Sequence, residues 1–371
     1  MSETVCLVAN TLGYVGGGGH RWVPLNWALG LRAIGSEVLW LETIPPDLVG
    51  RELKRREDAL RLDLERNGLA GSLLLYHERD EKHSEEMLEA LDRPLDLLLT
   101  LAYYAPPALR KIAHCTALLD LDPGLTQLWI RDGYLEVSGY DRYFSIGEGA
   151  RRRGGLPDCG IEWRPTAPCV HVAAWPLADA DPGAPYTTVS QWWLSPDDRY
   201  IELNGQWIEN NKRAAFEPFL KLPEETGVPL ELALDTVGSS EEERLRSLGW
   251  RVRDAATAIS TAATYASYIR SSRGEFSCAK PGYTRLLPGW VSDRTLCYLA
   301  SGKPAVVQYS GELGLPPDAC GLLQFRNPQE AAEALLEVEA NYQRYSRGAR
   351  ALAEDRFDAP RVAGALLEDA L

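Results

Sequence analysis

The chain has 371 residues, of which 45% are apolar and 25% charged, the ordinary balance of a folded globular protein. This length exceeds the size at which one hydrophobic core usually stops growing, which favours two domains. A net charge of −14 at pH 7 repels phosphate backbones and anionic membranes, and no basic stripe offsets it, so we expect no nucleic-acid partner.

The first residues run into an apolar segment without a basic or cleavable signal region, and no apolar stretch reaches about 18 residues. We therefore expect a cytoplasmic protein without a membrane span. The seven cysteines are scattered and form no CxxC pair, which fits reduced thiols better than disulfides or a zinc site.

Strand-like and helical patterns alternate along the first half of the sequence. The apolar patterns predict strands at residues 4–10, 37–41, 72–76, 95–101 and 116–121. The helical patterns cover residues 21–34, 51–67 and 84–91. This alternation predicts a mostly parallel sheet covered by helices on both faces.

A stretch rich in Pro, Gly and Asp at residues 154–185 suggests a domain boundary. The second half repeats the alternating pattern. Its expected strands are residues 186–193, 230–233 and 304–308. Its expected helices are residues 212–221, 240–248, 328–347, 349–354 and 359–371.

Four glycines, Gly16 to Gly19, lie between the first strand and the first helix, directly before His20. Glycines at this place let a ligand approach the backbone, so we expect Gly18 and Gly19 to contact one. Two other interpretations stay open. The run can be a flexible loop, or it can serve a nicotinamide dinucleotide together with Glu42, which ends the second strand, although the glycine spacing departs from the dinucleotide pattern.

The run GHRWVPLNWAL at residues 19–29, followed by GSEV at residues 35–38, resembles the opening GHxxPxxxLAxxLxxxGxxV of many inverting GT-B glycosyltransferases. In that family the matching histidine is the general base, so the resemblance nominates His20. An imidazole titrates near neutral pH and can take the proton of an attacking acceptor hydroxyl. Trp22 can stack on an acceptor, although its helical spacing from Trp27 also fits packing.

A catalytic histidine is usually oriented by a carboxylate. Asp120 and Asp122, at the end of the strand at residues 116–121, are the candidates. Both also suit the turn before Pro123, because aspartate side chains stabilise turns and helix starts.

Four further runs, EFS at 275–277, KPGY at 280–283, GWVSDR at 289–294 and LASGKP at 299–304, resemble the donor half of GT-B glycosyltransferases. The family 1 or CgeB-like group carries the most similar string. Ser292 and Asp293 would start a helix whose free N–H groups hold a diphosphate, and Arg294 would add a charged contact. The run YTTVSQW at residues 186–192 would begin the second domain, where Ser190 could touch phosphate or belong to a buried strand. The expected donor-binding residues are Gly18, Gly19, Ser190, Lys280, Gly282, Ser292, Asp293, Arg294 and Tyr298.

Cys297 stands where many relatives carry a glutamate that binds ribose, so the resemblance does not specify the nucleotide and favours an inverting mechanism over a retaining one. No DxD motif with flanking ligands calls for Mg²⁺ or Mn²⁺, and we expect a metal-independent enzyme with no cofactor beyond its nucleotide-sugar co-substrate, a UDP-, GDP- or dTDP-sugar.

The sequence therefore predicts a GT-B fold of two Rossmann-like domains, at residues 1–180 and 181–355, with a helix at 356–371 that crosses back to the first domain. The expected activity is transfer of a sugar to a small-molecule acceptor, for instance in natural-product biosynthesis, by a monomer or homodimer. A NAD-dependent oxidoreductase and a catalytically silent sugar-binding relative remain as alternatives.

Overall fold

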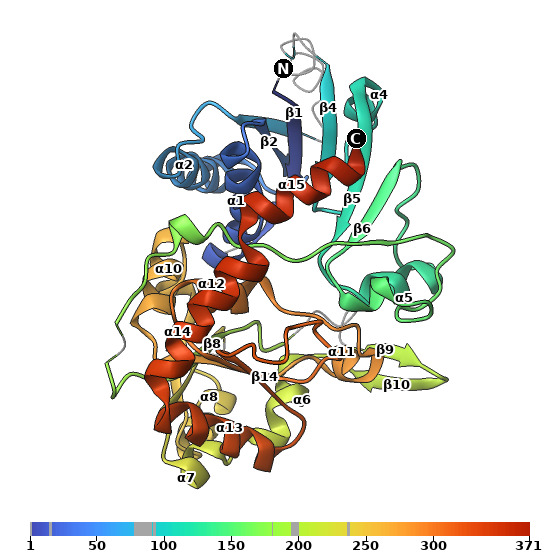
Figure 1. Cartoon of the computed structure of the whole chain (residues 1–371). Coiled ribbons are helices and arrows are strands. Elements are labelled where there is room, and N and C mark those ends of the chain that lie inside the picture. The colour runs from blue at the N-terminus through green and yellow to red at the C-terminus, as the bar shows by residue number, and fades with distance from the viewer. Residues whose placement is uncertain are drawn as a thin grey trace.

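The structure is a computed structural model that describes residues 2–14, 17–77, 91, 94–179, 181–193, 200–235 and 238–371. It has a mixed α/β architecture with two parallel sheets, which lie in the upper and lower halves of the molecule in Figure 1. The α/β fold predicted from the sequence is therefore confirmed. The helix expected at residues 84–91 falls almost wholly outside the described residues.

The first sheet has seven parallel strands in the order β3-β2-β1-β4-β5-β6-β7. They are β1 (Thr4–Ala9), β2 (Glu37–Ile44), β3 (Leu73–His77), β4 (Leu95–Thr100), β5 (Ala113–Asp120), β6 (Arg142–Ser145) and β7 (Arg164–Pro165). All six residues of β1 are buried, which explains the continuous apolar run in the sequence. The strand order reverses between β1 and β4, and sheets of this kind bind ligands beyond the carboxyl ends of their strands at the reversal.

The second sheet has six parallel strands in the order β12-β11-β8-β13-β14-β15. They are β8 (Tyr186–Val189), β11 (Leu230–Leu234), β12 (Arg251–Asp254), β13 (Gly274–Ser277), β14 (Ala305–Gln308) and β15 (Leu322–Phe325). An antiparallel hairpin of β9 (Tyr200–Leu203) and β10 (Gln206–Glu209) stands apart from this sheet. The strand expected at 186–193 ends at Val189, and β12, β13 and β15 were not predicted from the sequence.

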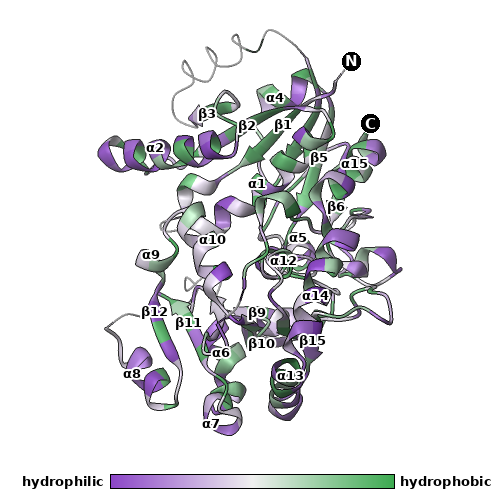
Figure 2. Cartoon of the chain, turned by 60° about the vertical axis from the view of Figure 1, so that its left-hand side comes forward, coloured by the Kyte–Doolittle hydropathy of each residue, from purple (hydrophilic) through white to green (hydrophobic). Residues whose placement is uncertain are grey.

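The helices of the first half are α1 (Gly18–Ala33), α2 (Gly50–Arg66), α4 (Pro107–Ile112) and α5 (Leu125–Arg131). Those of the second half are α6 (Lys212–Phe216), α7 (Leu222–Thr226), α8 (Ser240–Ser247), α9 (Ala255–Ala258), α10 (Ala262–Ser271), α11 (Pro281–Leu286), α12 (Asp293–Ala300), α13 (Pro328–Ala340), α14 (Tyr342–Leu352) and α15 (Ala359–Ala370). The single helix expected at 328–347 is thus two helices that meet at Asn341. In Figure 2 the hydrophobic strands β1 and β5 lie inside, and the polar faces of α2 and α8 lie outside.

The last helix lies against the first half, beside α1 (Figure 1). Gly30 of α1 approaches this helix so closely that a Cβ would lie 2.7 Å from the carbonyl oxygen of Ala359. Nearby, Val170 donates to the carbonyl of Phe357 (2.8 Å) and accepts from the N–H of Ala359 (2.9 Å). The chain therefore crosses between the halves at two adjacent places. The domain limits at 180 and 355 stay predictions.

Candidate active site

A cavity of about 610 Å³ lies between the two halves, beyond the carboxyl ends of β1 and β8. We call it the central cleft. It brings together six of the residues singled out in the sequence, namely Gly19, His20, Ser190, Ser292, Asp293 and Arg294. Since these residues come from both halves, a ligand bound in the central cleft would contact loops that follow strands of both sheets.

His20 is the third residue of α1 and faces the central cleft. The ring of Tyr14 lies over its imidazole, with the ring centres 3.7 Å apart. Loss of solvation lowers the pKa of His20 to about 4, and the charge of Asp122 acts in the opposite direction. The imidazole is therefore neutral at neutral pH, which is the state in which it can accept a proton.

The two aspartates that follow β5 have different surroundings. The buried carboxylate of Asp120 accepts hydrogen bonds from Gln127 Nε2 (2.8 Å), Ser145 Oγ (2.8 Å) and the N–H of Asp122 (2.9 Å). Burial raises the pKa of Asp120 to about 6, although the hydrogen bonds from Gln127 and Ser145 oppose the rise. Asp122 accepts a hydrogen bond from the hydroxyl of Tyr283, in the second half. Asp122 is thus the carboxylate whose charge reaches His20, and Asp120 holds the turn.

The glycines before His20 serve a contact within the protein. The N–H of Gly18 donates to the carbonyl of Ile259 (3.0 Å), and a Cβ on Gly18 would overlap the carbonyl of Thr261. A Cβ on Gly19 would lie 2.5 Å from the ring of Tyr265. The start of α1 therefore needs these glycines because the second half packs directly against it. Gly16 lies outside the described residues.

The first turn of α12 lines the central cleft. Ser292 is the N-cap, but its side chain makes no capping hydrogen bond. Asp293 Oδ1 is buried without a partner, and burial raises the pKa of Asp293 to about 7, with a further rise from the charge of Asp122. An anion at this helix terminus would meet unsatisfied donors and a carboxyl group that is partly protonated near pH 7.

The guanidinium of Arg294 is held by three protein groups. It donates to Glu275 Oε1 (2.8 Å), the carbonyl of Val189 (2.9 Å) and Ser277 Oγ (2.6 Å). Arg294 lines the cleft, but a bidentate contact with a phosphate would require it to leave some of these partners.

Lys212, which the sequence reasoning did not nominate, is a buried cation beside this site. Its Nζ donates to the carbonyl of Cys278, and it shares a small cavity with Ser292 and Arg294. Burial and the positive charges of Arg294 and Lys280 lower the pKa of Lys212 to about 7. In the sequence, Lys212 stands out only because it follows Asn211, which caps α6. This position indicates the start of a helix and not a ligand-binding residue.

The remaining nominated residues do not line the central cleft: they are Gly18, Trp22, Asp120, Asp122, Lys280, Gly282 and Tyr298. Lys280 is the N-cap of α11, where its charge acts on Lys212. Gly282 donates its N–H to Asn210 Oδ1 (2.8 Å) and is tightly packed. Tyr298 is fully buried and shares a hydrogen bond of 2.6 Å with the hydroxyl of Thr187. The contacts of Gly282 and Tyr298 are those of core residues.

Trp22 lies inside the protein, between the halves. Its indole N–H donates to the carbonyl of Ala262 (2.8 Å), and its ring lies 4.5 Å from that of Trp175. Only 6% of its surface is exposed. The packing interpretation of Trp22 therefore fits the structure.

The carboxylate of Glu42, required by the dinucleotide alternative, is fully buried. It accepts hydrogen bonds from the N–H of Leu12 (2.7 Å), Trp40 Nε1 (2.9 Å) and Thr11 Oγ1 (3.1 Å). Burial raises its pKa to about 7. Glu42 holds the turn after β1 and offers no free oxygen to a ribose hydroxyl.

Among the described residues, no three His, Cys, Asp or Glu side chains are grouped so that they could hold a metal ion. Within the same part of the chain, no helix combines the length and apolar character that crossing a membrane requires.

No model of a protein family matches the sequence, and no curated protein sequence matches it either. Solved structures do match over nearly the whole chain. HepE of Anabaena in complex with UDP and glucose is 10% identical, with 99% of each chain covered and a TM-score of 0.60. An α-glucosyltransferase in complex with UDP and a 13-mer DNA is 12% identical, with 100% of this chain and 99% of that one covered and a TM-score of 0.58.

AviGT4, a glycosyltransferase involved in avilamycin A biosynthesis, is 14% identical over 99% of this chain and 97% of its own, with a TM-score of 0.56. At such low identity these likenesses concern the fold. Together with the two parallel sheets and the cleft between them, they give the conclusion that this chain has the GT-B fold.

Proposed function

We propose that the protein is a glycosyltransferase that moves a sugar from a nucleotide carrier to a hydroxyl of a small molecule. The observation that carries this proposal is the central cleft, where His20 of one half faces the uncapped first turn of α12 in the other. The UDP and UDP-glucose bound by HepE make a UDP-sugar the first donor to test.

The donor diphosphate lies at the first turn of α12 in this proposal. Its negative charge is balanced by the free N–H groups, by Lys212 and by the positive field of Arg294. A diphosphate would restore the full charge of Lys212, because an adjacent anion favours the ammonium form. These groups also stabilise the charge that develops when the diphosphate leaves, and the reaction needs no metal ion in this scheme.

His20 acts as the general base. Its neutral imidazole takes the proton of the acceptor hydroxyl while the acceptor oxygen forms its bond to the anomeric carbon. The bond from that carbon to the phosphate oxygen breaks, and the diphosphate leaves with the electron pair. Attack from the side opposite the leaving group inverts the configuration. Asp122 stabilises the imidazolium that results. Asp120 positions Asp122, because its carboxylate accepts a hydrogen bond from the backbone N–H of Asp122.

Calorimetric titration with UDP, GDP, dTDP, NAD and NADP tests this proposal. We expect a nucleoside diphosphate to bind the wild type and His20→Ala alike, and to bind Lys212→Met at least about tenfold more weakly because a charged phosphate contact is lost. Arg294→Ala should weaken binding as well.

Binding of NAD alone, with loss on Glu42→Ala, would instead favour the oxidoreductase. Donor binding without transfer to any acceptor and without hydrolysis of the nucleotide sugar would favour the silent relative. A small-molecule acceptor from natural-product biosynthesis is our first expectation, and turnover on glycans or lipid-linked substrates alone would contradict it.

A further inference from the structure

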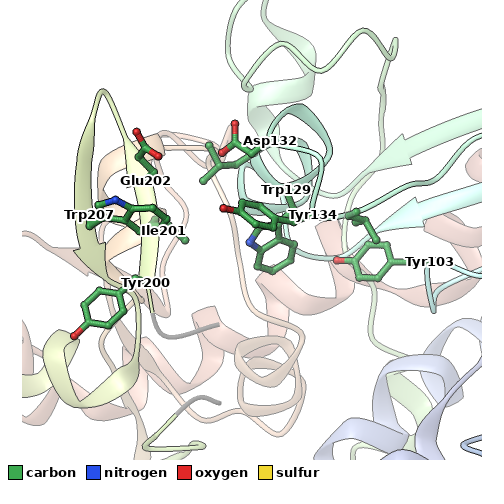
Figure 3. Close-up of a pocket in the computed structure, with 10 residues that line it drawn as sticks. Tyr103, Trp129, Asp132, Tyr134, Tyr200, Ile201, Glu202 and Trp207 are labelled. Atoms are coloured by element: carbon green, nitrogen blue, oxygen red, sulfur yellow. The ribbon is translucent and has the colours of Figure 1, made fainter. Parts of the chain in front are cut away.

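A second cavity, of about 400 Å³, is lined by none of the residues nominated from the sequence. Five aromatic side chains line it: Tyr103, Trp129, Tyr134, Tyr200 and Trp207. We call it the aromatic pocket. Figure 3 shows the hairpin β9–β10, with Tyr200 and Trp207, on one side and Trp129 and Tyr134 on the other.

The walls of the aromatic pocket come from both halves of the molecule. Trp129 lies on α5 and Tyr134 follows that helix, whereas Tyr200 and Trp207 belong to the hairpin. Below them, Leu125 and Leu128 of α5 pack with Ile201 of the hairpin in one buried apolar cluster. Because this cluster ties the hairpin to α5, the two aromatic walls are held at a fixed separation.

Several of these rings are open to solvent. Tyr134 is 73% exposed and Trp207 is 62% exposed. Large rings gathered around a concave surface leave apolar area in water that a ligand could cover, whereas single exposed rings need no explanation. Rings on two facing walls suit a flat ligand, which can stack on both.

Acidic side chains outnumber basic ones at the aromatic pocket. Asp132 and Glu202 are the charged residues among the described ones that line it, and Figure 3 shows Glu202 on the hairpin side and Asp132 on the opposite side. Arg131 pairs with Asp132 (2.7 Å), and the charge of Glu202 also acts on this guanidinium, so one cation stands against the two carboxylates. The net charge that remains is negative. Carboxylates accept hydrogen bonds from hydroxyl or ammonium groups and repel anions. The pocket therefore favours a ligand that carries donors at its edge and no negative charge.

Tyr103 links the aromatic pocket to the candidate base. It lines the pocket, its hydroxyl shares a hydrogen bond of 2.9 Å with Thr126, and the charge of Asp122 acts on it. Its backbone has a φ of 61°, a left-handed conformation that non-glycine residues adopt at a cost, often at ligand sites. One residue thus contacts the pocket and lies near the carboxylate that acts on His20.

We propose that the aromatic pocket holds the acceptor, and that the acceptor is a flat aromatic ring system with hydroxyl or amino groups and no negative charge. This assignment of the pocket as an acceptor site rests on the proposed function. The hydroxyl to be glycosylated would extend past Tyr103 towards His20, while the rest of the ring system stacks between the hairpin and α5.

Three hydroxyindoles that share one ring and differ in charge test the proposal by equilibrium dialysis. They are neutral 5-hydroxyindole, cationic 5-hydroxytryptamine and anionic 5-hydroxyindole-3-acetate, and maltotriose serves as a carbohydrate for comparison. We expect the neutral and cationic probes to bind at least about tenfold more tightly than the anion and than maltotriose.

Trp207→Ala and Tyr134→Ala should each weaken binding of the neutral probe about tenfold, since each removes one stacking surface. Both side chains are mostly exposed, so the variants should fold. Trp193→Ala is the matched control: this tryptophan is also exposed but packs against Arg213 away from the pocket, and its loss should change nothing. UDP affinity should stay at the wild-type value in all three variants.

Equal affinity for the anion, tighter binding of maltotriose, or insensitivity to Trp207→Ala and Tyr134→Ala would each overturn the proposal. Failure of the proposed function gives a different result. In that case no nucleoside diphosphate binds, whatever the hydroxyindoles do. Hydroxyindole binding that depends on Trp207, together with UDP binding that depends on Lys212, supports both.

Discussion

The ionisable groups around the central cleft are held away from their usual charge states by burial. His20 loses its proton more readily than in water, Lys212 has a pKa near 7, and Asp293 keeps its proton up to about pH 7. Each of these groups can change charge when a ligand arrives, which is the behaviour expected of groups that handle protons and phosphate.

The pH profile of sugar transfer should report the pKa of His20. A base works only when neutral, so kcat/KM should fall with decreasing pH around the pKa of His20 in the free enzyme, near pH 4 rather than 6.5. Asp122→Asn removes the charge that raises this pKa, and the fall should move to still lower pH. The rate at pH 7 should drop about a hundredfold or more, because the imidazolium loses its partner.

Asp158→Asn, at an exposed carboxylate outside the cleft, should leave both the profile and the rate unchanged. A fall in kcat/KM that stays near pH 6.5 in wild type and Asp122→Asn alike would contradict both the lowered pKa of His20 and its coupling to Asp122.

Binding of the donor should be accompanied by proton uptake at Lys212. Lys212 is mostly neutral at pH 8 in the free protein, and a bound diphosphate would raise its pKa, so binding should take up close to one proton there. Little uptake by Lys212 is expected at pH 6, where it is already charged. Calorimetry in buffers of different ionisation enthalpy measures the number of protons.

Asp293 also titrates near pH 7 and would add uptake of its own, so the two groups are separated by variants. Lys212→Met should remove the uptake assigned to Lys212, and Asp293→Asn should retain it. An unchanged uptake in Lys212→Met would contradict the assignment of the phosphate contact.

At the scale of elements, α12 and α13 are two helices whose N-caps differ. The side chain of Ser292 makes no capping hydrogen bond at α12, whereas Asn327 Oδ1 accepts from the N–H of Glu330 (3.0 Å) at α13. The cap formed by Asn327 stabilises α13. The lack of a side-chain cap at Ser292 leaves backbone N–H donors of α12 free at the central cleft.

Ser292→Ala should therefore cost little stability but weaken UDP binding about tenfold, because a donor to phosphate is lost. Asn327→Ala should show the reverse, a loss of about 1 kcal/mol in the free energy of unfolding and unchanged UDP affinity. Chemical denaturation and calorimetric titration of both variants measure the two effects. Equal losses of stability in the two variants would mean that Ser292 also caps its helix.

At the scale of the whole molecule, the helix α15 joins the end of the chain to the first half. The carbonyl of Ala359 lies against Gly30, and Cys115 Sγ donates to the carbonyl of Ala370 (3.3 Å). The face of α15 that meets α1 is apolar and buried, so the two halves should unfold together.

Gly30→Ala tests this coupling, because the added methyl group meets backbone atoms that cannot move without shifting the helix. We expect a loss of about 1 to 3 kcal/mol and a lower melting temperature in differential scanning calorimetry. Gly364→Ala, on α15 itself, is the matched control, since the nearest atom to its new Cβ would be 3.9 Å away. A melting temperature equal to that of Gly364→Ala would mean that the close approach is not required.

The sequence by itself determined the parallel α/β architecture, because apolar runs of buried strands and the helical period are local patterns. The bounds of β1 and β11 and of α8 and α15 were predicted to within one or two residues. The motifs also brought His20, Ser190, Ser292 and Arg294 into one hypothesis, and the structure places these four residues around one cleft.

Only the tertiary structure decided what contacts each side chain makes. Gly18, Trp22 and Tyr298 have residue types that suit a ligand site, yet all three pack inside the protein. The second half covers Gly18 and Trp22, whereas Tyr298 lies in the core of the second half itself. The sequence did not predict a role for Lys212 or the presence of the aromatic pocket, because the residues around each come from distant segments of the chain. A local pattern carries no information on such contacts, since burial, charge and cavities arise only when separate elements meet.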